Sequence, residues 1–222
     1  MKILIVYAHP EPKSMNGAMF NTAITTLQEA GHEVQTSDLY AMQFNPTSDR
    51  TNFTSVYNDA FFKQQLEEQH ASRVNGFAAD VAAEQEKIAW CDVMIWQFPM
   101  WWFSIPAILK GWVDRVFAMG TSYGNGHIYE TGIYTGKKAM LSLTIGGPED
   151  AYISGGLHGD LENILKPIHR GIFQFTGFSV LEPQVIHGPA RMSPEERALA
   201  LEKWTGRLTQ IAEEAAIELT AY

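Results

Sequence analysis

Short hydrophobic runs alternate along this chain with longer stretches in which apolar residues recur at helical spacing. Five of the runs have the length and composition of β-strands, at residues 2–8, 33–38, 93–98, 138–144 and 178–186. Strands that alternate with helices form parallel sheets covered on both faces. We therefore expect an α/β, flavodoxin-like fold, with a five-stranded parallel sheet in the order 2-1-3-4-5 and helices on both faces.

The helical pattern predicts five helices, in chain order at 16–30, 78–90, 106–116, from just after residue 159, and from residues 193–196 onward. Gly31 suits the position after the first helix. Pro167 should start, break or kink a turn in the fourth helix. The last helix begins at a capping box, Ser193 to Glu196, and its apolar face runs to Ala215.

Residues 41 to 77 do not fit this alternation. They form a long connection that contains Phe53, Tyr57, Phe61 and Phe62. Connections of this length inside a compact domain usually have a function or form an interface. We expect this segment to do one or the other.

The composition suits one domain spanning residues 1–222, because a chain that is 45% hydrophobic can bury a sizeable core. A formal charge of −9 argues against nucleic acid or anionic lipid as the main partner. The only cysteine, Cys91, is interpreted as a buried thiol. The apolar N-terminal run is too brief for a signal peptide, and no segment predicts stable membrane insertion. These features favour a cytoplasmic protein.

The loop after the first strand, residues 9–18, carries His9, Ser14 and Asn16 to the start of a helix. Unpaired N–H groups and the helix dipole both favour an anion there, so the loop predicts a phosphate-bearing cofactor. The alternative is that Ser14 or Asn16 only caps the helix and His9 makes an ordinary hydrogen bond. The spacing is neither G-x-G-x-x-G nor a P-loop, which disfavours a Rossmann dinucleotide site and a nucleotide P-loop.

Two further loops follow buried strands and suit a flat ring. Residues 98–103 read FPMWWF, and residues 144–147 read TIGG. In an open parallel sheet the ligand crevice lies outside the carboxyl ends of the strands. The two loops therefore suggest a flat aromatic cofactor with polar edges, and the sequence predicts a flavin enzyme.

The tryptophans around the first of these loops divide by position. Trp96 and Trp112 are expected in the core, whereas Trp101, Trp102 and Phe103 lie past the strand end and could wall a stacking slot. In the second loop, Gly146 and Gly147 let the backbone approach a ligand, with Thr144 as a polar group beside them. A plain glycine turn explains that loop equally well.

Tyr152 and His158 follow, six residues apart in a glycine-rich stretch. On one mobile loop beside the ring they would form a pair of proton donors, although a lone histidine is more often structural. The sequence has no H-E-x-x-H or C-x-x-C motif and no acidic cluster with ligand spacing, so we expect no metal.

Over nearly its whole length the chain resembles the NAD(P)H:quinone acceptor oxidoreductases, the DT-diaphorase family, in the segments AHPEPKSMNGAM, SDLYAMQFNP, DVAAEQ, QFPMWWFSIPAILKGW, RVF, KKAMLSLTIGG, HGDLENILKPI and GFSVLEPQ. The resemblance implies a homodimeric FAD enzyme. It would move two electrons, by ping-pong hydride transfer, from NADH or NADPH to quinones and similar flat acceptors.

The resemblance also implies roles for individual residues. The pyrophosphate side would use His9, Ser14, Met15, Asn16 and Ala18. The isoalloxazine and ribityl chain would use Pro99, Met100, Trp102, Phe103, Thr144, Ile145, Gly146 and Gly147, with Trp101 and Tyr152 beside them. Tyr152 and His158 match the catalytic pair, and the acceptor would lie against Trp102, Phe103, Gly146, His158 and, from the other subunit, Tyr123 and Asn125.

Some positions depart from the family pattern. Asn125 stands where a second pocket tyrosine is common, between Gly124 and Gly126, so we expect a more polar and more flexible lid. Arg170 and Gln174 stand where one relative has the histidine ligands of a structural metal, which again predicts no metal.

Three other functions stay open. The chain could be a flavin-binding ancillary subunit of a potassium-efflux system, which copurification with a membrane protein would support. It could be an FMN-dependent azoreductase, which the mass of the flavin would distinguish. A flavodoxin-type electron carrier is a third, but its phosphate loop is normally rich in Ser, Thr and Gly, unlike residues 9–18.

Overall fold

A parallel sheet forms the centre of the computed structural model, which describes residues 1–220; Ala221 and Tyr222, the end of the expected domain, lie outside the described residues. The strands are β1 (Lys2–Tyr7), β2 (Glu33–Asp38), β3 (Val93–Pro99), β4 (Lys138–Ile145), β5 (Ser179–Val180) and β6 (Gln184–His187). Their order is β2-β1-β3-β4-β5, with β6 also paired to β4. The predicted order 2-1-3-4-5 is confirmed.

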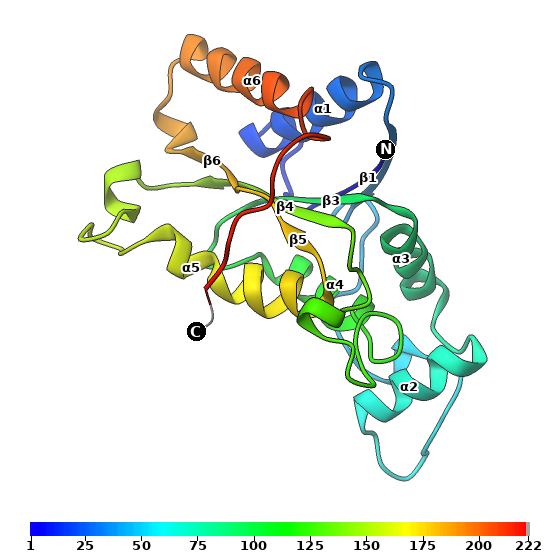
Figure 1. The fold of residues 1–222 in the computed structure, drawn as a ribbon. Helices are drawn as coiled ribbons and strands as arrows, with labels where there is room; N and C mark the ends of the chain where they lie inside the picture. Colours follow the sequence, from blue (N-terminus) through cyan, green and yellow to red (C-terminus); the bar gives the residue numbers. More distant parts are fainter. Residues whose placement is uncertain (221–222) are drawn as a thin grey trace.

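Helices cover both faces of the sheet (Figure 1). One face carries α1 (Met15–Glu29) and α6 (Pro194–Leu208), and the other carries α3 (Ala79–Trp90), α4 (Ala107–Val116) and α5 (Leu161–Ile168). α2 (Gln64–Val74) stands away from the sheet. Single turns are η1 (Arg50–Asn52), η2 (Tyr129–Thr131), η3 (Glu149–Tyr152) and η5 (Pro189–Arg191), and a π-helical stretch, η4 (His169–Gln174), continues α5. No helix among residues 1–220 is long and apolar enough to cross a membrane.

The core explains why the strands are apolar without alternation. In β1, Ile3 and Ile5 pack under α1 and α6, while Leu4 and Val6 pack under the helices of the opposite face. A strand covered on both faces needs apolar residues at every position. Trp96, Trp112 and Cys91 are fully buried, as predicted. Burial raises the pKa of the Cys91 thiol to about 11, so it stays protonated.

The prediction of one final strand over residues 178–186 is wrong. β5 pairs with the start of β4, and β6 pairs with its end, from Ser142 to Ile145. Glu182 and Pro183 lie between the two short strands. Because proline has no N–H to give to a ladder, the strand is interrupted there and the sheet gains a sixth strand.

Three helical expectations also change. α6 begins at the predicted capping box but ends at Leu208, well before Ala215, although Ile211 beyond its end is still buried. Pro167 lies inside α5 and does not break it, but the helix changes to π-helical geometry at His169, two residues later. Residues 41–77 contain α2, which the hydrophobic pattern missed because this helix is mostly polar and buries little apolar surface.

Candidate active site

The loops after β1, β3 and β4 open at the same edge of the sheet. The parallel register places Tyr7 beside Gln97, and Pro99 beside Thr144, so the three strands end side by side. The winding reverses between β1 and β3, and a crevice at such a point is where open α/β sheets bind ligands. The predicted phosphate loop and both predicted ring loops therefore meet at one site.

Ser14 caps helix α1. Its hydroxyl accepts a hydrogen bond from the Gly17 N–H at 3.1 Å. This is the capping role that the sequence offered as the alternative to phosphate binding. The cap satisfies one N–H of the first turn, while the N–H groups of Met15 and Asn16 have no intrahelical partner by the geometry of a helix. The capped terminus therefore still offers donors and a dipole to an anion.

His9 lies at this end of the site. Its Nδ1 lies 3.0 Å from the Glu11 backbone nitrogen, 3.1 Å from the Glu11 carbonyl oxygen and 3.1 Å from Ser14 Oγ. A neutral ring accepts from the amide N–H in one tautomer and donates to the carbonyl in the other. Burial lowers the pKa of His9, which favours this neutral form.

Asn16 does not point its side chain at a ligand. Its amide nitrogen donates to Thr144 Oγ1 at 2.7 Å, and its amide oxygen accepts from Gln97 Nε2 at 2.8 Å. All three residues are buried. The structure therefore gives Asn16 a positioning role, since it ties the phosphate loop to the ring loop after β4, and leaves its backbone N–H for binding.

A cleft of about 380 Å³ collects the residues of the predicted phosphate side. It is lined by His9, Ser14, Met15, Asn16, Ala18 and Thr144, together with Lys13, Pro189, Ala190, Arg197 and Leu201. Arg197 belongs to the first turns of α6, which packs against α1. Sequence reasoning missed this cation because only the packing of two helices distant in sequence brings it to the cleft.

The aromatic loop after β3 is held in an unusual backbone conformation. Trp102 and Phe103 have φ values of 51° and 58°, a region that bulky residues rarely adopt. Two backbone hydrogen bonds, of 3.1 and 3.0 Å, join Trp101 to Ser104 across them. Met100 donates its N–H to the Thr144 carbonyl at 2.8 Å. This loop leaves Trp102 95% exposed, with its ring free to contact a ligand.

The loop after β4 carries the predicted catalytic pair to the aromatic loop. The ring centroids of Tyr152 and His158 are 4.8 Å apart, and Phe103 lies 5.3 Å from His158 and 6.4 Å from Tyr152. A Cβ on Gly147 would sit 2.8 Å from the Tyr152 ring, so a larger residue there would displace that ring, whereas Gly146 has open space around it. Ile145 points into the core and can offer only its backbone. The catalytic roles of Tyr152 and His158 stay a prediction.

Tyr123 and Asn125 lie on a loop away from the segment that carries Tyr152 and His158. The Tyr123 ring is 5.7 Å from Phe175, and its hydroxyl is 3.5 Å from Glu68 Oε2. Burial, and then the charge of Glu68, raises the pKa of Tyr123. Their loop lies beside α4 and far from η3, which precedes His158 (Figure 1). One chain alone therefore does not bring these two residues to Tyr152 and His158.

Arg170 and Gln174 bind each other. Arg170 Nη1 donates to Gln174 Oε1 at 2.9 Å, and the guanidinium lies 4.6 Å from the centroid of the Tyr129 ring. Across residues 1–220, no three His, Cys, Asp or Glu side chains are grouped to hold a metal ion.

Comparison with known proteins places this chain among flavodoxin-like proteins. Residues 1–210 match the family described as having a flavodoxin-like fold. The chain is 41% identical to the human ribosyldihydronicotinamide dehydrogenase (quinone) over 222 residues, covering 100% of this chain and 96% of that protein. It is 42% identical to NAD(P)H dehydrogenase (quinone) 1 of Rattus norvegicus, covering 96% of this chain and 78% of the relative. A Klebsiella pneumoniae crystal structure described as a quinone reductase superposes with a TM-score of 0.94 at 41% identity, covering 98% of this chain and 87% of the other.

Proposed function

This chain belongs to the family with the flavodoxin-like fold, and we propose that it is an FAD-dependent NAD(P)H dehydrogenase that passes two electrons to quinones and similar flat acceptors. The observation that carries the proposal is the meeting of Phe103, Tyr152 and His158 at the same sheet edge as the α1 anion site. Relatives named as quinone dehydrogenases, at 41–42% identity, support it.

The residues present fit a flavin dinucleotide. The capped start of α1 offers donors to a phosphate, and the open space at Gly146 allows the backbone to approach a ring. The cleft continues from α1 to Arg197 on α6, which supplies a cation for a second phosphate. That extension favours FAD over FMN. When bound, the flavin supplies the group that accepts and returns an electron pair.

The protein's own side chains would bind and orient the reactants. Trp102 and Phe103 wall one side of the slot, where a nicotinamide and a quinone would lie in turn. Tyr152 and His158 would hydrogen-bond at the edge of the flavin and stabilise the negative charge that develops there, with His158 holding a proton for transfer. Tyr152 is buried and fixed against Gly147, which keeps this donor in place.

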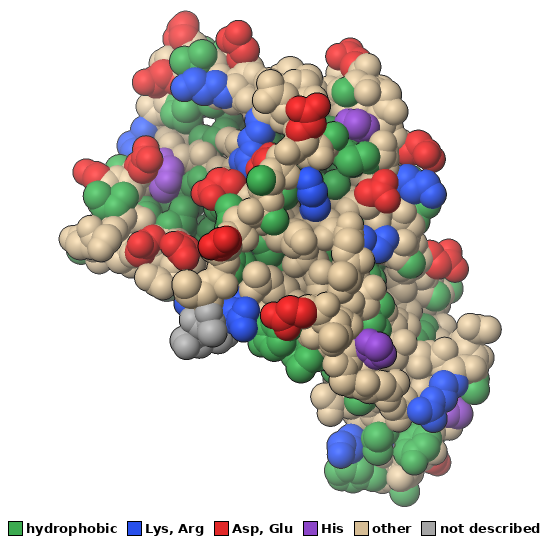
Figure 2. Space-filling view, viewed as in Figure 1, with side chains coloured by type: hydrophobic (Ala, Val, Ile, Leu, Met, Phe, Trp, Pro, Cys, Tyr) green, Lys and Arg blue, Asp and Glu red, His purple; other side chains and the backbone are tan. Residues whose placement is uncertain are grey.

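The complete site requires a second copy of the chain. The loop that carries Tyr123 and Asn125 lies far from the segment that follows η3 (Figure 1), and large apolar side chains are exposed on the segment before α2. Figure 2 shows apolar side chains at the tip of the protruding lobe that includes α2. We infer a homodimer with two sites, each using Tyr123 and Asn125 of the partner subunit. The lone buried thiol of Cys91 suits a reducing compartment, and we place the enzyme in the cytoplasm.

Identification of the bound flavin tests the proposal directly. The purified protein should be yellow and should release FAD on denaturation, as read by mass spectrometry. Anaerobic stopped-flow reduction with NADH, NADPH and dihydronicotinamide riboside would then identify the donor, because the relatives' names differ on this point. Released FMN would support an azoreductase. Copurification with a membrane protein would support an ancillary role in potassium efflux. A colourless protein that does not bind FAD would overturn the proposal.

A further inference from the structure

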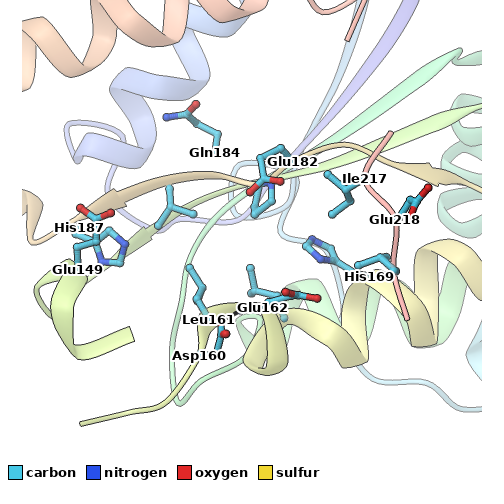
Figure 3. Close-up of a pocket in the computed structure, with 14 residues that line it drawn as sticks. Glu149, Asp160, Leu161, Glu162, His169, Glu182, Gln184, His187, Ile217 and Glu218 are labelled. Atoms are coloured by element: carbon cyan, nitrogen blue, oxygen red, sulfur yellow. Dashed lines mark hydrogen bonds between the residues drawn. The ribbon is translucent and has the colours of Figure 1, made fainter. Parts of the chain in front are cut away.

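A second cavity, of about 630 Å³, lies beside η3, the turn that ends at Tyr152. It is enclosed by α5, by the sheet edge at β6 and by the C-terminal segment around Ile217 (Figure 3). None of its lining residues lines the cleft at the start of α1. The two sites approach each other where His187 meets Tyr152, with ring centroids 5.8 Å apart.

The walls of this cavity are strongly acidic. Five carboxylates from four segments line it: Glu149, Asp160 and Glu162 at the start of α5, Glu182 and Glu218. Neither lysine nor arginine is among its lining residues in the described part of the chain. Acidic side chains around a cleft with low-dielectric walls focus a negative potential inside it. The remaining surface includes apolar side chains such as Leu161, Val185 and Ile217.

His169 adds a buried group without a partner. It is 1% exposed, and within residues 1–220 neither of its ring nitrogens has a hydrogen-bond partner. In Figure 3 its ring extends from the end of α5 toward the space under Ile217. Burial lowers its pKa to about 4, so at neutral pH the ring offers one acceptor and one donor. A buried polar group left unsatisfied is costly, so this ring is suited to a ligand that donates a hydrogen bond.

We propose that this cavity binds an organic cation, a protonated amine carried on an apolar body. The ammonium group would lie among the carboxylates and donate to the free nitrogen of His169, while the apolar body would contact Leu161, Val185 and Ile217. The volume is in the range of sites for small organic ligands. An anion would be repelled by the five carboxylates. A metal ion fits less well, because the acidic and histidine side chains of residues 1–220 are not grouped as a ligand set.

Three probes that share a phenyl ring and a two-carbon chain, but carry a cationic, a neutral or an anionic head group, test the proposal. Calorimetric titration of the flavin-loaded enzyme would compare phenethylamine, phenethyl alcohol and phenylacetate. We expect the amine to bind at least about tenfold more tightly than the alcohol, and more weakly at ~0.5 M salt, because several partly exposed carboxylates contribute. Phenylacetate should not bind. Equal affinity for amine and alcohol, or full displacement of the amine by a low concentration of Mn²⁺, would overturn the assignment.

Variants then locate the binding. Glu182→Gln and Glu218→Gln should each weaken amine binding about threefold or more, and His169→Phe should weaken it by a similar factor through the lost acceptor. Glu33→Gln, on the distant strand β2, is the matched control and should leave the affinity unchanged. The two glutamates are exposed at the rim, so these variants keep the test valid if the His169 variant does not fold. Unchanged amine affinity in both glutamate variants would rule out binding in this cavity.

Discussion

The side-chain amide of Asn16 donates to the hydroxyl of Thr144 across 2.7 Å, although the two residues are 128 positions apart in sequence. The bond joins the start of α1 to the end of β4. Gln97, at the end of β3, holds the same amide from its other side. The phosphate end and the ring end of the proposed flavin site are therefore set relative to each other by one buried chain of three polar side chains.

Thr144→Val should loosen both ends at once. The change keeps the shape of the side chain but leaves the buried Asn16 donor unsatisfied, which costs about 1–3 kcal/mol of unfolding free energy. We also expect weaker retention of flavin. Urea denaturation and flavin titration measure the two effects, with Thr25→Val on the exposed side of α1 as the control. If the two variants behave alike, the bond has no positioning role.

His158→Ala should slow reduction of the flavin by roughly 10- to 10³-fold, the range for loss of one donor or general acid. Flavin binding should change little. Tyr152→Phe should slow flavin reduction by a smaller factor. The double variant should reduce the flavin no more slowly than His158→Ala if the two residues act as a unit. Anaerobic stopped-flow kinetics provide the measurement, and His32→Ala, at the opposite end of β1, is the control. Unchanged rates would reduce His158 to a wall of the pocket.

Phe61→Asp should weaken the proposed dimer. Phe61 is 68% exposed beside other exposed apolar side chains, and a charge at an apolar contact must be desolvated when the subunits associate. Sedimentation equilibrium should show a larger dissociation constant and, in parallel, loss of quinone reduction at low protein concentration. Leu199→Asp, at an exposed apolar position on α6, is the matched control. A fully active monomer in the unsubstituted protein would contradict the two-subunit site.

His169 should make the protein less stable as the pH falls. Its folded-state pKa of about 4 lies below the ordinary value of 6.5, so below about pH 6.5 the unfolded chain binds a proton that the folded chain does not. Above that pH, His169 does not change the free energy of unfolding through its titration. Near pH 4 it lowers the free energy of unfolding by about 3 kcal/mol. Urea denaturation across this window should show a flatter pH dependence for His169→Phe than for the parent protein. A variant at exposed His127, His127→Phe, should keep the parent slope.

Much of the fold could be predicted because its signals are local. The strands that build the centre of a doubly covered sheet are uninterrupted apolar runs, and a capping box marks the start of α6. The split of the last strand was missed because Leu181 is apolar and buried like a strand residue, and only Pro183 indicates the interruption. α2 was missed because polar helices lack the periodic apolar face on which such predictions rest.

The residue types of the candidate site could be predicted from the sequence. The hydrogen bonds and packing contacts that join its segments could not. The loops that end at one sheet edge follow from the parallel topology, which is why the loops of His9 and Phe103 could be assigned to one crevice, whereas the assignment of Tyr152 rested mainly on the family resemblance. The bond from Asn16 to Thr144 and the approach of Arg197 depend on packing between segments far apart in the chain. No local pattern contains that information.

The split of the final strand also protects this edge of the sheet from other chains. A long edge strand with free N–H and C=O groups is a template for intermolecular pairing. Here the outer edge consists of two short strands separated by a proline, and the Ile217 N–H already donates to the Val180 carbonyl at 2.8 Å. An incoming strand would find only a few consecutive backbone groups to pair with. The irregular end of the sheet therefore serves as a barrier to aggregation.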